Sequence, residues 1–318
     1  MIVRTVLGDI DPAHLGAAYM HEHLIIDSPL VADRMPHIHL PSVDDATTEV
    51  DACKRAGVGA MVDTMPAASG RNVGALAEIS RRTGVHILAV TGLHTAKYYP
   101  GRPWAQEASP ETLADLFTAD IELGIDRYDY TGPVVERTSH RAGVIKVVSG
   151  GPSIDDRNRS LFEAAAEVHR RTGAPVLTHC EEGRGAVEQV ELMRDLGMPL
   201  ERVVLSHTDK VPEAGLHKEL LSSGVNLEYD QALRQADDPA PPTARLLAEM
   251  IGAGFLGRLM LGTDGARRTL WTSLGGRPGL AWLLTGFAGV LDKAGVDEAS
   301  RHQLLVENPA RFLAFEAA

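Results

Sequence analysis

Eight short, almost entirely apolar segments, separated by stretches with helical patterning, constrain the fold of this chain more than any other feature of its sequence. Segments that are apolar at nearly every position are typical of strands buried on both faces. Strands that alternate with helices along a chain predict a parallel sheet. The predicted strands are residues 17–26, 59–64, 86–91, 144–148, 175–179, 203–207, 225–229 and 259–263.

The segments between these strands carry the start and stop signals of helices. Ser42 and Asp44 are candidate N-caps of the first helix, and a glycine follows the end of each predicted helix, as is usual at helix C-termini. The predicted helices are residues 42–56, 72–83, 110–123, 158–172, 185–196 and 242–251.

Eight strand–helix units indicate an α/β protein whose sheet closes into a (β/α)8 barrel, the TIM barrel. The tail, residues 280–315, reads as additional C-terminal helices that pack outside the barrel. An open doubly wound sheet is the alternative architecture, but it would place ligands at one switch point. Polar residues here follow many different strands, which favours the barrel.

The length and charge of the chain narrow its organisation and its partners. The 318 residues suit one barrel, and no linker rich in Gly, Ser or Pro divides them, so we expect one domain over residues 1–318. The net charge of -12 argues against nucleic acid and anionic membranes as partners. The sequence has no signal-peptide pattern and no apolar run near the ~20 residues of a membrane span. We therefore expect a cytoplasmic protein that acts on a small molecule.

Histidines, a lysine and an aspartate occupy unusual positions on the predicted strands. His21 and His23 lie two residues apart on one strand, so their side chains point to the same face. Lys146 interrupts an apolar strand, where a lysine is costly unless it is paired, neutral or linked to a metal. His179, His207 and Asp264 follow other strands, at the end where barrels carry their active sites.

A single buried histidine is more often structural than functional, but these six residues together indicate a metal centre. An ammonium group cannot bind a metal ion, so Lys146 fits such a centre only when it is deprotonated or chemically altered. Reaction of the neutral amine with carbon dioxide gives a carbamate, whose two oxygen atoms can bridge two cations.

The motifs around these residues resemble the phosphotriesterase branch of the amidohydrolase superfamily over nearly the whole chain. The motifs are His21-Glu22-His23-Leu24, Val144-Ile145-Lys146-Val147, Thr178-His179, Ser206-His207, Gly262-Thr263-Asp264 and residues 307–313.

This resemblance implies two divalent metal ions. His21, His23 and Asp264 would bind the more buried ion, and His179 and His207 the more exposed one. N6-carboxylated Lys146 would bridge the pair, with a hydroxide as the second bridge. Zinc is the metal that the resemblance favours, with cobalt and manganese as alternatives.

The implied reaction is hydrolysis by attack of the bridging hydroxide. The two cations would lower the pKa of the bridging water, and the exposed ion would polarise the carbonyl or phosphoryl oxygen of the substrate. Asp264 is the predicted catalytic residue, because it would accept the proton of the attacking group and pass it outward.

The loops after the strands determine the substrate. Residues 262–271 and Tyr98-Tyr99-Pro100 resemble a subgroup that hydrolyses sugar lactones, some of them phosphorylated. Its phosphate-binding members have an arginine, a tyrosine three residues later and a lysine in the loop after strand seven. This chain has Arg267, Leu270 and Gln235 at these positions, with Arg234 beside the last. The predicted substrate-binding residues are Arg267, Arg268, Tyr98, Lys97, Asp230 and Gln235.

The most favoured function is therefore a lactonase that acts on a sugar-type or related lactone. An organophosphate phosphotriesterase and an amide hydrolase that uses the same metals are alternatives. A metal-binding barrel without catalysis is a third, disfavoured because a structural metal site is usually closed and tetrahedral. The resemblance also suggests a homodimer.

Overall fold

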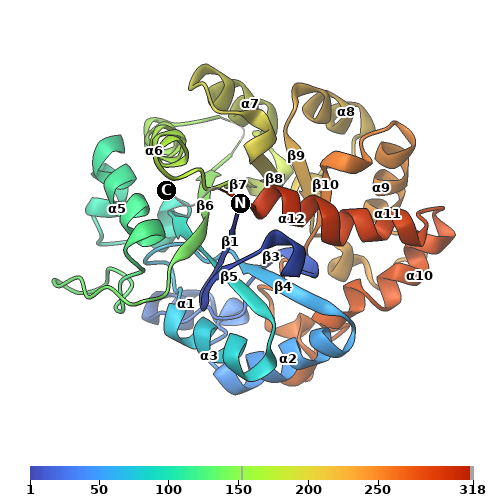
Figure 1. Cartoon of the computed structure of the whole chain (residues 1–318), viewed down its shortest axis with the longest axis horizontal. Coiled ribbons are helices and arrows are strands. Elements are labelled where there is room, and N and C mark those ends of the chain that lie inside the picture. The colour runs from blue at the N-terminus through green and yellow to red at the C-terminus, as the bar shows by residue number, and fades with distance from the viewer. Residues whose placement is uncertain (152, 316–318) are drawn as a thin grey trace.

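The predicted strands form one parallel sheet in sequential order in the computed structural model, which describes residues 1–151 and 153–315. The backbone amides of Thr263 and Asp264 donate to the carbonyl oxygen of His21, so the last strand meets the first and the sheet forms a barrel (Figure 1). The strands are β3 (Ala17–Glu22), β4 (Val58–Asp63), β5 (His86–Gly92), β6 (Ala142–Ser149), β7 (Val176–Cys180), β8 (Val203–Ser206), β9 (Asn226–Tyr229) and β10 (Leu259–Leu261).

Helices surround this barrel, as the sequence patterns predict. Of the two candidate caps of α2, Ser42 takes the role, because its hydroxyl oxygen accepts the backbone N–H of Asp45 at 3.1 Å. The sequence patterns did not predict α1, α4 or α8. Within the described residues, no helix is both long and apolar enough to cross a bilayer. The helices up to β10 are α1 (Pro29–Arg34), α2 (Val43–Arg55), α3 (Val73–Thr83), α4 (Trp104–Glu107), α5 (Pro110–Glu122), α6 (Asp156–Thr172), α7 (Ala186–Asp195), α8 (Ala214–Ser223) and α9 (Pro242–Gly252).

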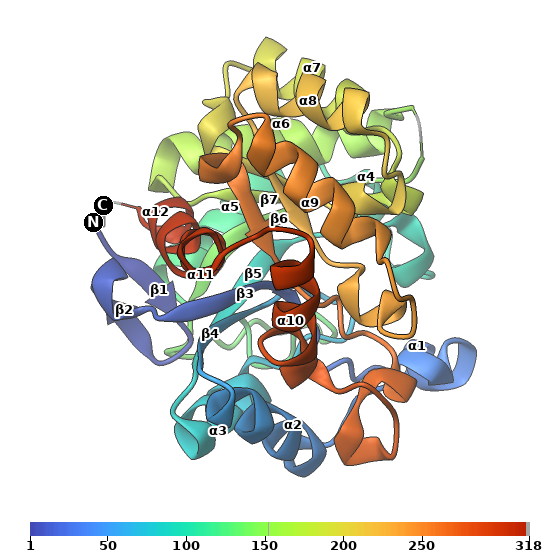
Figure 2. The same ribbon diagram turned by 90° about the vertical axis from the view of Figure 1, so that its right-hand side faces the viewer.

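The amino-terminal end of the barrel is closed by the two ends of the chain. An antiparallel hairpin of β1 (Val3–Thr5) and β2 (Gly8–Ile10), which the sequence patterns did not predict, lies here. The tail forms α10 (Gly286–Lys293), α11 (Glu298–His302) and α12 (Asn308–Leu313). Both chain termini and α12 lie on this side, whereas α1 lies on the opposite side (Figure 2). Apolar side chains of the hairpin and of α12 pack against the barrel interior.

Candidate active site

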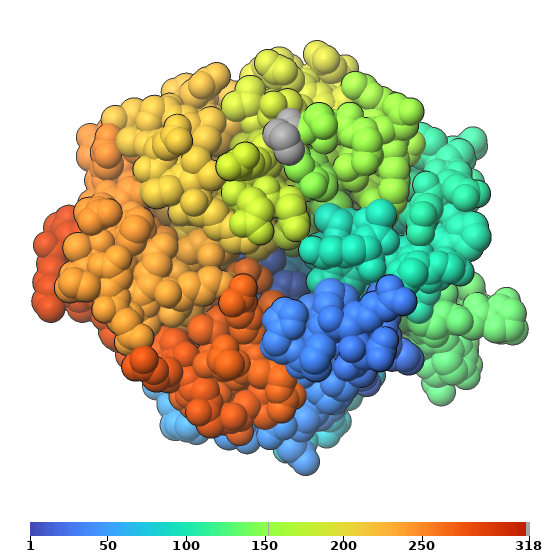
Figure 3. Space-filling view, turned by 180° about the vertical axis from the view of Figure 1, so that it is seen from behind, coloured from blue at the N-terminus to red at the C-terminus, as the bar shows by residue number. Residues whose placement is uncertain are grey.

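A cavity of about 610 Å³ opens at the carboxyl-terminal end of the strands. Seen from that side, the surface is hollowed at its centre, where segments from distant parts of the sequence meet (Figure 3). The cavity brings together all six predicted metal-binding residues, which are His21, His23, Lys146, His179, His207 and Asp264.

An irregularity in β3 turns His21 and His23 toward the cavity. Met20 belongs to the apolar barrel interior, so strict alternation would turn Glu22 inward and His21 outward. The register instead advances by three residues in β3 while β4 advances by two. Such a bulge adds one residue and reverses the alternation. It places the rings of His21 and His23 side by side, with centroids 5.4 Å apart.

Lys146 and His179 reach the cavity by plain strand alternation. Each follows an inward-facing apolar residue two positions earlier, Val144 in β6 and Leu177 in β7. Lys146 comes from β6 and His21 from β3, and the two side chains meet at the barrel mouth. The Nζ atom of Lys146 lies 3.4 Å from Nε2 of His21. The amine is therefore within reach of the ligands on β3, where a carbamate on Lys146 would have to act.

His207 and Asp264 leave their strands in a left-handed backbone conformation. Their φ angles are +66° and +43°, values that residues other than glycine adopt only at a cost in energy. Nε2 of His207 faces Nδ1 of His179 at 2.9 Å. The fold thus maintains strained backbone at two of the six positions, and such strain is common at functional sites.

Burial keeps His21, His23 and His179 neutral. Loss of solvent lowers the pKa of His23 to about 4 and that of His179 to about 3, and it lowers the pKa of His21 well below its ordinary value. Burial also lowers the pKa of Lys146 to about 8. Neutral imidazole is the form that binds metals, and a neutral amine is the form that reacts with carbon dioxide.

Arg234 holds Asp264 in place at the cavity wall. Its Nη2 atom donates to Oδ2 of Asp264 at 2.8 Å and to the backbone oxygen of Asp264 at 2.7 Å. The other carboxylate oxygen, Oδ1, lies 3.5 Å from Nε2 of His23. Burial raises the pKa of Asp264, but neighbouring positive groups, Arg234 first, outweigh that effect and keep the pKa below its ordinary value. Asp264 is therefore ionised, with Oδ1 on the side of the histidines.

The donor atoms form two overlapping groups that could each hold a divalent cation, and His21 belongs to both. His21, His23 and Asp264 each offer a ligand atom within 4.8 Å of the others, and the same holds for His21, His207 and Asp230. The Nδ1 atoms of His21 and His23 are buried without a hydrogen-bond partner among the described residues. Imidazole nitrogens with a carboxylate are a donor set that zinc, cobalt and manganese accept. The first group coincides with the predicted ligands of the more buried ion.

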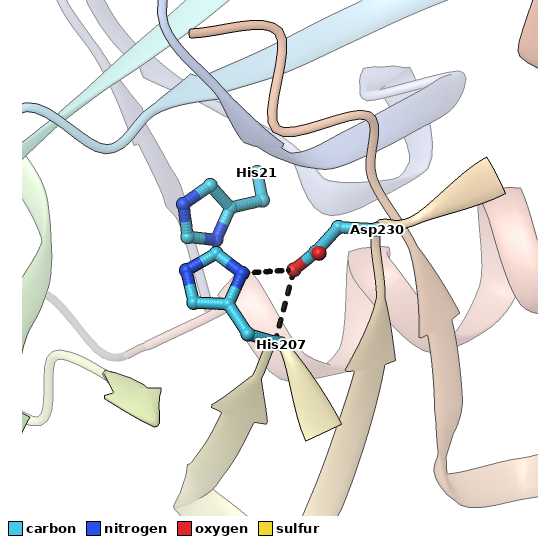
Figure 4. A group of neighbouring side chains, drawn as sticks. All are labelled: His21, His207 and Asp230. Carbon is cyan, nitrogen blue, oxygen red and sulfur yellow. Dashed lines mark hydrogen bonds and ion pairs between the residues drawn. The ribbon is translucent and has the colours of Figure 1, made fainter. Parts of the chain in front are cut away.

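Asp230 contacts the ring nitrogen of His207 that faces away from His179. Its Oδ2 atom is 2.7 Å from Nδ1 of His207 and accepts the backbone N–H of His207 at 3.0 Å (Figure 4). The opposite ring nitrogen, Nε2, faces His179. A carboxylate in this place orients the imidazole of a metal ligand. The predicted direct contact of Asp230 with a substrate stays a prediction, and its position favours a role in holding His207.

Four other predicted substrate-binding residues lie at or near the mouth of the cavity. Lys97, Tyr98, Gln235 and Arg267 line it. Lys97 Nζ lies 3.3 Å from a carboxylate oxygen of Glu181. Gln235 also caps α9, because its Oε1 atom accepts the backbone N–H of a residue in the first turn at 3.0 Å.

Arg268 and Leu270, two further residues of the segment that resembles the sugar-lactone subgroup, differ in their exposure to solvent. Arg268 is exposed and donates to the backbone oxygen of His39 at 2.9 Å, so it ties two loops together. Leu270 is buried in the apolar core, so it offers no hydroxyl group at the position where the phosphate-binding subgroup has tyrosine. Direct contact of Arg268 with a substrate stays a prediction.

Two charged residues of the site were not predicted. Glu228 lies between Leu227 and Tyr229 on a buried strand, and a charged residue at such a position is a signal in the sequence that could have identified it. Arg234 lies in a loop of mixed composition, and only its distance to Asp264 in the folded chain shows its role.

Comparisons with known proteins place this arrangement in context. The model of the phosphotriesterase family matches residues 1–313. A phospho-furanose lactonase of Mycoplasmopsis synoviae (strain 53) is 31% identical over 98% of this chain and 92% of its own length. An N-acetyltaurine hydrolase of Danio rerio is 26% identical over 99% of this chain and 98% of its own length. The crystal structure of an amidohydrolase from Mycoplasma synoviae superposes with a TM-score of 0.94 at 29% identity, covering 99% of this chain and 92% of that one.

Proposed function

This chain belongs to the phosphotriesterase family, and we propose that it is a metal-dependent hydrolase that opens the ring of a sugar-type lactone. The observation that carries this proposal is the convergence of four histidines, Lys146 and Asp264 on the floor of one cavity. Neutral imidazoles with a carboxylate are typical of catalytic metal sites, and the cavity leaves space for a substrate beside them.

Two divalent cations would be held by the chain's own side chains. His21, His23 and Asp264 would bind one, His179 and His207 the other, and N6-carboxylated Lys146 would lie between them. We propose zinc, with cobalt or manganese able to replace it. When bound, such a pair activates a water molecule and polarises the carbonyl group of the ester.

Asp264 has the position of a general base. Its ionised carboxylate can accept the proton of the attacking water at Oδ1, which points toward His23. Arg234 fixes the carboxylate through Oδ2 and cannot itself accept a proton. The proton therefore leaves Asp264 for the ring oxygen of the lactone or for solvent. One C–O bond of the ring breaks, and the product is a hydroxy acid.

The cavity wall favours a substrate with polar substituents, because it carries charged groups of both signs. Lys97 and Arg234 are paired with Glu181 and Asp264, whereas Arg267 lines the cavity without such a partner among the described residues, and arginine suits recognition of carboxylate, phosphate or hydroxyl oxygens. The lactonase relative acts, by its name, on a phosphorylated furanose lactone. The buried Leu270 removes one expected phosphate contact, so we propose a sugar-type lactone without requiring a phosphate.

A substrate panel on the zinc-loaded protein tests this proposal. The panel contains aldonolactones with and without phosphate, acyl-homoserine lactones, paraoxon and N-acetyltaurine. We expect kcat/KM to be highest for an aldonolactone. Faster turnover of N-acetyltaurine would instead assign amide hydrolysis, and faster turnover of paraoxon would assign phosphotriester hydrolysis. No turnover of any compound by fully loaded protein would favour a metal-binding barrel without catalysis.

Two finer expectations belong to the same proposal. We propose that two copies of the chain associate, as the family resemblance suggests, and that the protein works in the cytoplasm on a small metabolite. Size-exclusion chromatography with light scattering tests the first, since a monomer mass at micromolar concentration would contradict it. Localisation of a tagged copy tests the second.

A further inference from the structure

Strand β9 and the residue that follows it supply two buried carboxyl groups two residues apart, Glu228 within the strand and Asp230 directly after it. Asp230 lies behind His207 and contacts its Nδ1 atom at 2.7 Å (Figure 4). Glu228 lies behind a different histidine, since its Oε2 atom is 3.6 Å from Nδ1 of His21. Both carboxylates are completely buried. This segment therefore places an acid behind a histidine of each half of the predicted metal centre.

Among the described residues, the surroundings of Glu228 do not compensate for its burial: burial first, and then the neighbouring Asp230, raise the pKa of Glu228 well above its ordinary value. Both of its oxygen atoms lack a hydrogen-bond partner there, and so does Nδ1 of His21. An unsatisfied buried polar group costs roughly 1–3 kcal/mol, and a carboxylate costs more. A chain keeps such a group when function needs it, because an apolar residue would be more stable in the same place.

The space between these two side chains is kept open by Gly262. A Cβ atom at this position would collide with Oε1 of Glu228 and would lie 2.7 Å from the backbone nitrogen of His21. No other residue type fits there without moving one of the two. The chain thus leaves a direct path from the carboxylate to the imidazole.

The two nitrogens of His21 face different surroundings. Nε2 points to the centre of the site, 3.4 Å from Nζ of Lys146, and Nδ1 points to Glu228. Histidines that bind a metal through one nitrogen almost always donate the N–H of the other nitrogen to a carboxylate or a carbonyl group. The gap of 3.6 Å exceeds a hydrogen bond, so the two side chains must move closer together for His21 to donate to Glu228.

We propose that Glu228 is the positioning residue of His21, accepting its Nδ1–H so that Nε2 is held toward the more buried metal ion. This inference rests on the proposed metal centre. It also explains why a buried acid lies on this strand, since a carboxylate that accepts the N–H of a ligand raises the basicity of that ligand. Asp230 does the same for His207, so the two acids form a matched pair.

The test is the rate at which zinc-loaded protein loses metal to a chelator that changes colour on binding zinc. Glu228→Leu removes the acceptor, and we expect metal loss about 10–100-fold faster than in the wild type. Glu228→Gln keeps one acceptor oxygen, so we expect most of the wild-type retention to return. We also expect Glu228→Leu to unfold at a higher temperature than the wild type when both are stripped of metal, because it removes an unsatisfied buried carboxylate.

Glu49→Gln is the matched control. Glu49 is equally buried, but it lies on α2 and accepts hydrogen bonds from Thr272, Ser273 and the backbone of Leu280. We expect this variant to lose thermal stability without losing metal faster.

The outcomes separate the two proposals. Wild-type protein that binds no zinc would overturn the metal centre and this inference with it. Wild-type protein that holds zinc, with Glu228→Leu releasing it at the same rate, would overturn only the role of Glu228. Faster release that the glutamine variant does not correct, together with a lower unfolding temperature of the stripped protein, would also overturn that role, because it would show a structural effect.

Discussion

The two ends of the barrel interior differ in polarity, because one is lined by apolar side chains and the other by polar and charged ones. At the amino-terminal end, Val3, Leu15 and Phe312 pack on inward-facing apolar residues of the strands and close the barrel. At the carboxyl-terminal end, the same strands present histidines, Lys146 and acids, several of which lack partners within the described structure. The closed end buries apolar side chains against one another, and this burial stabilises the fold. The open end leaves polar atoms free for a ligand, and the stability of the other end offsets that cost.

Among the substitutions that test this difference between the two ends, we expect the largest effect on activity from Asp264→Asn at the open end. The amide cannot accept the proton of the attacking water, so kcat for the best lactone should fall about 10²–10⁴-fold. The measurement is kcat with metal content determined on the same sample. A variant with full metal content and a rate near that of the wild type would show that Asp264 is not the base.

The closed end should show the reverse pattern with Phe312→Ala. Phe312 is 2% exposed and its removal leaves a cavity, which costs about 3–5 kcal/mol in the free energy of unfolding. Urea denaturation measures this loss, and kcat/KM should stay within about twofold because the cavity lies far from the site. Leu7→Ala is the control, since Leu7 is 47% exposed at the same end. If Phe312→Ala is fully folded under the assay conditions and still loses most of its activity, the two ends of the barrel do not have separate roles.

A smaller effect is expected from Arg234→Met, which frees the carboxylate of Asp264. Charge-assisted hydrogen bonds contribute about 1.5–3 kcal/mol, so kcat should fall about 10–100-fold. Arg82→Met is the control, because Arg82 on α3 pairs with Asp44 on α2 outside the cavity, and its kcat should stay within about twofold of the wild type. Equal effects of the two substitutions would remove the special role of Arg234.

The smallest effect is a pH dependence at Lys146. Because burial lowers the pKa of Lys146 to about 8, its neutral fraction at pH 7 far exceeds that of an exposed lysine. At a fixed concentration of dissolved carbon dioxide, stripped protein given zinc should regain activity faster as pH rises. The rate should increase about fivefold from pH 7 to 8 and less than about twofold above pH 8. A rate that keeps rising tenfold per unit up to pH 10 would contradict a lowered pKa.

Sequence patterns predicted the barrel because strand identity depends on local composition. Eight apolar runs gave the eight strands, with ends that differ by a few residues, as for the first run, residues 17–26, against β3. They did not predict the β1–β2 hairpin, α1, α4 or α8, whose short segments carry weak periodicity. The predicted fold is not changed by such errors, because it depends on the number and order of the barrel strands.

The site was predictable in its residues but not in its geometry. Six side chains were identified from their positions on strands, and all six meet in one cavity. The bulge at His21 and the positive φ angles of His207 and Asp264 depend on closure of the barrel, which no local pattern encodes. Arg234 likewise needs the folded chain to reach Asp264.

The most direct test of the account is the metal content of the wild-type protein after reconstitution with zinc and bicarbonate, measured by inductively coupled plasma mass spectrometry. The account predicts about two zinc ions per chain, as in other two-metal hydrolytic sites. A value near zero, on folded protein, would contradict the reading of the open end of the barrel as a metal centre.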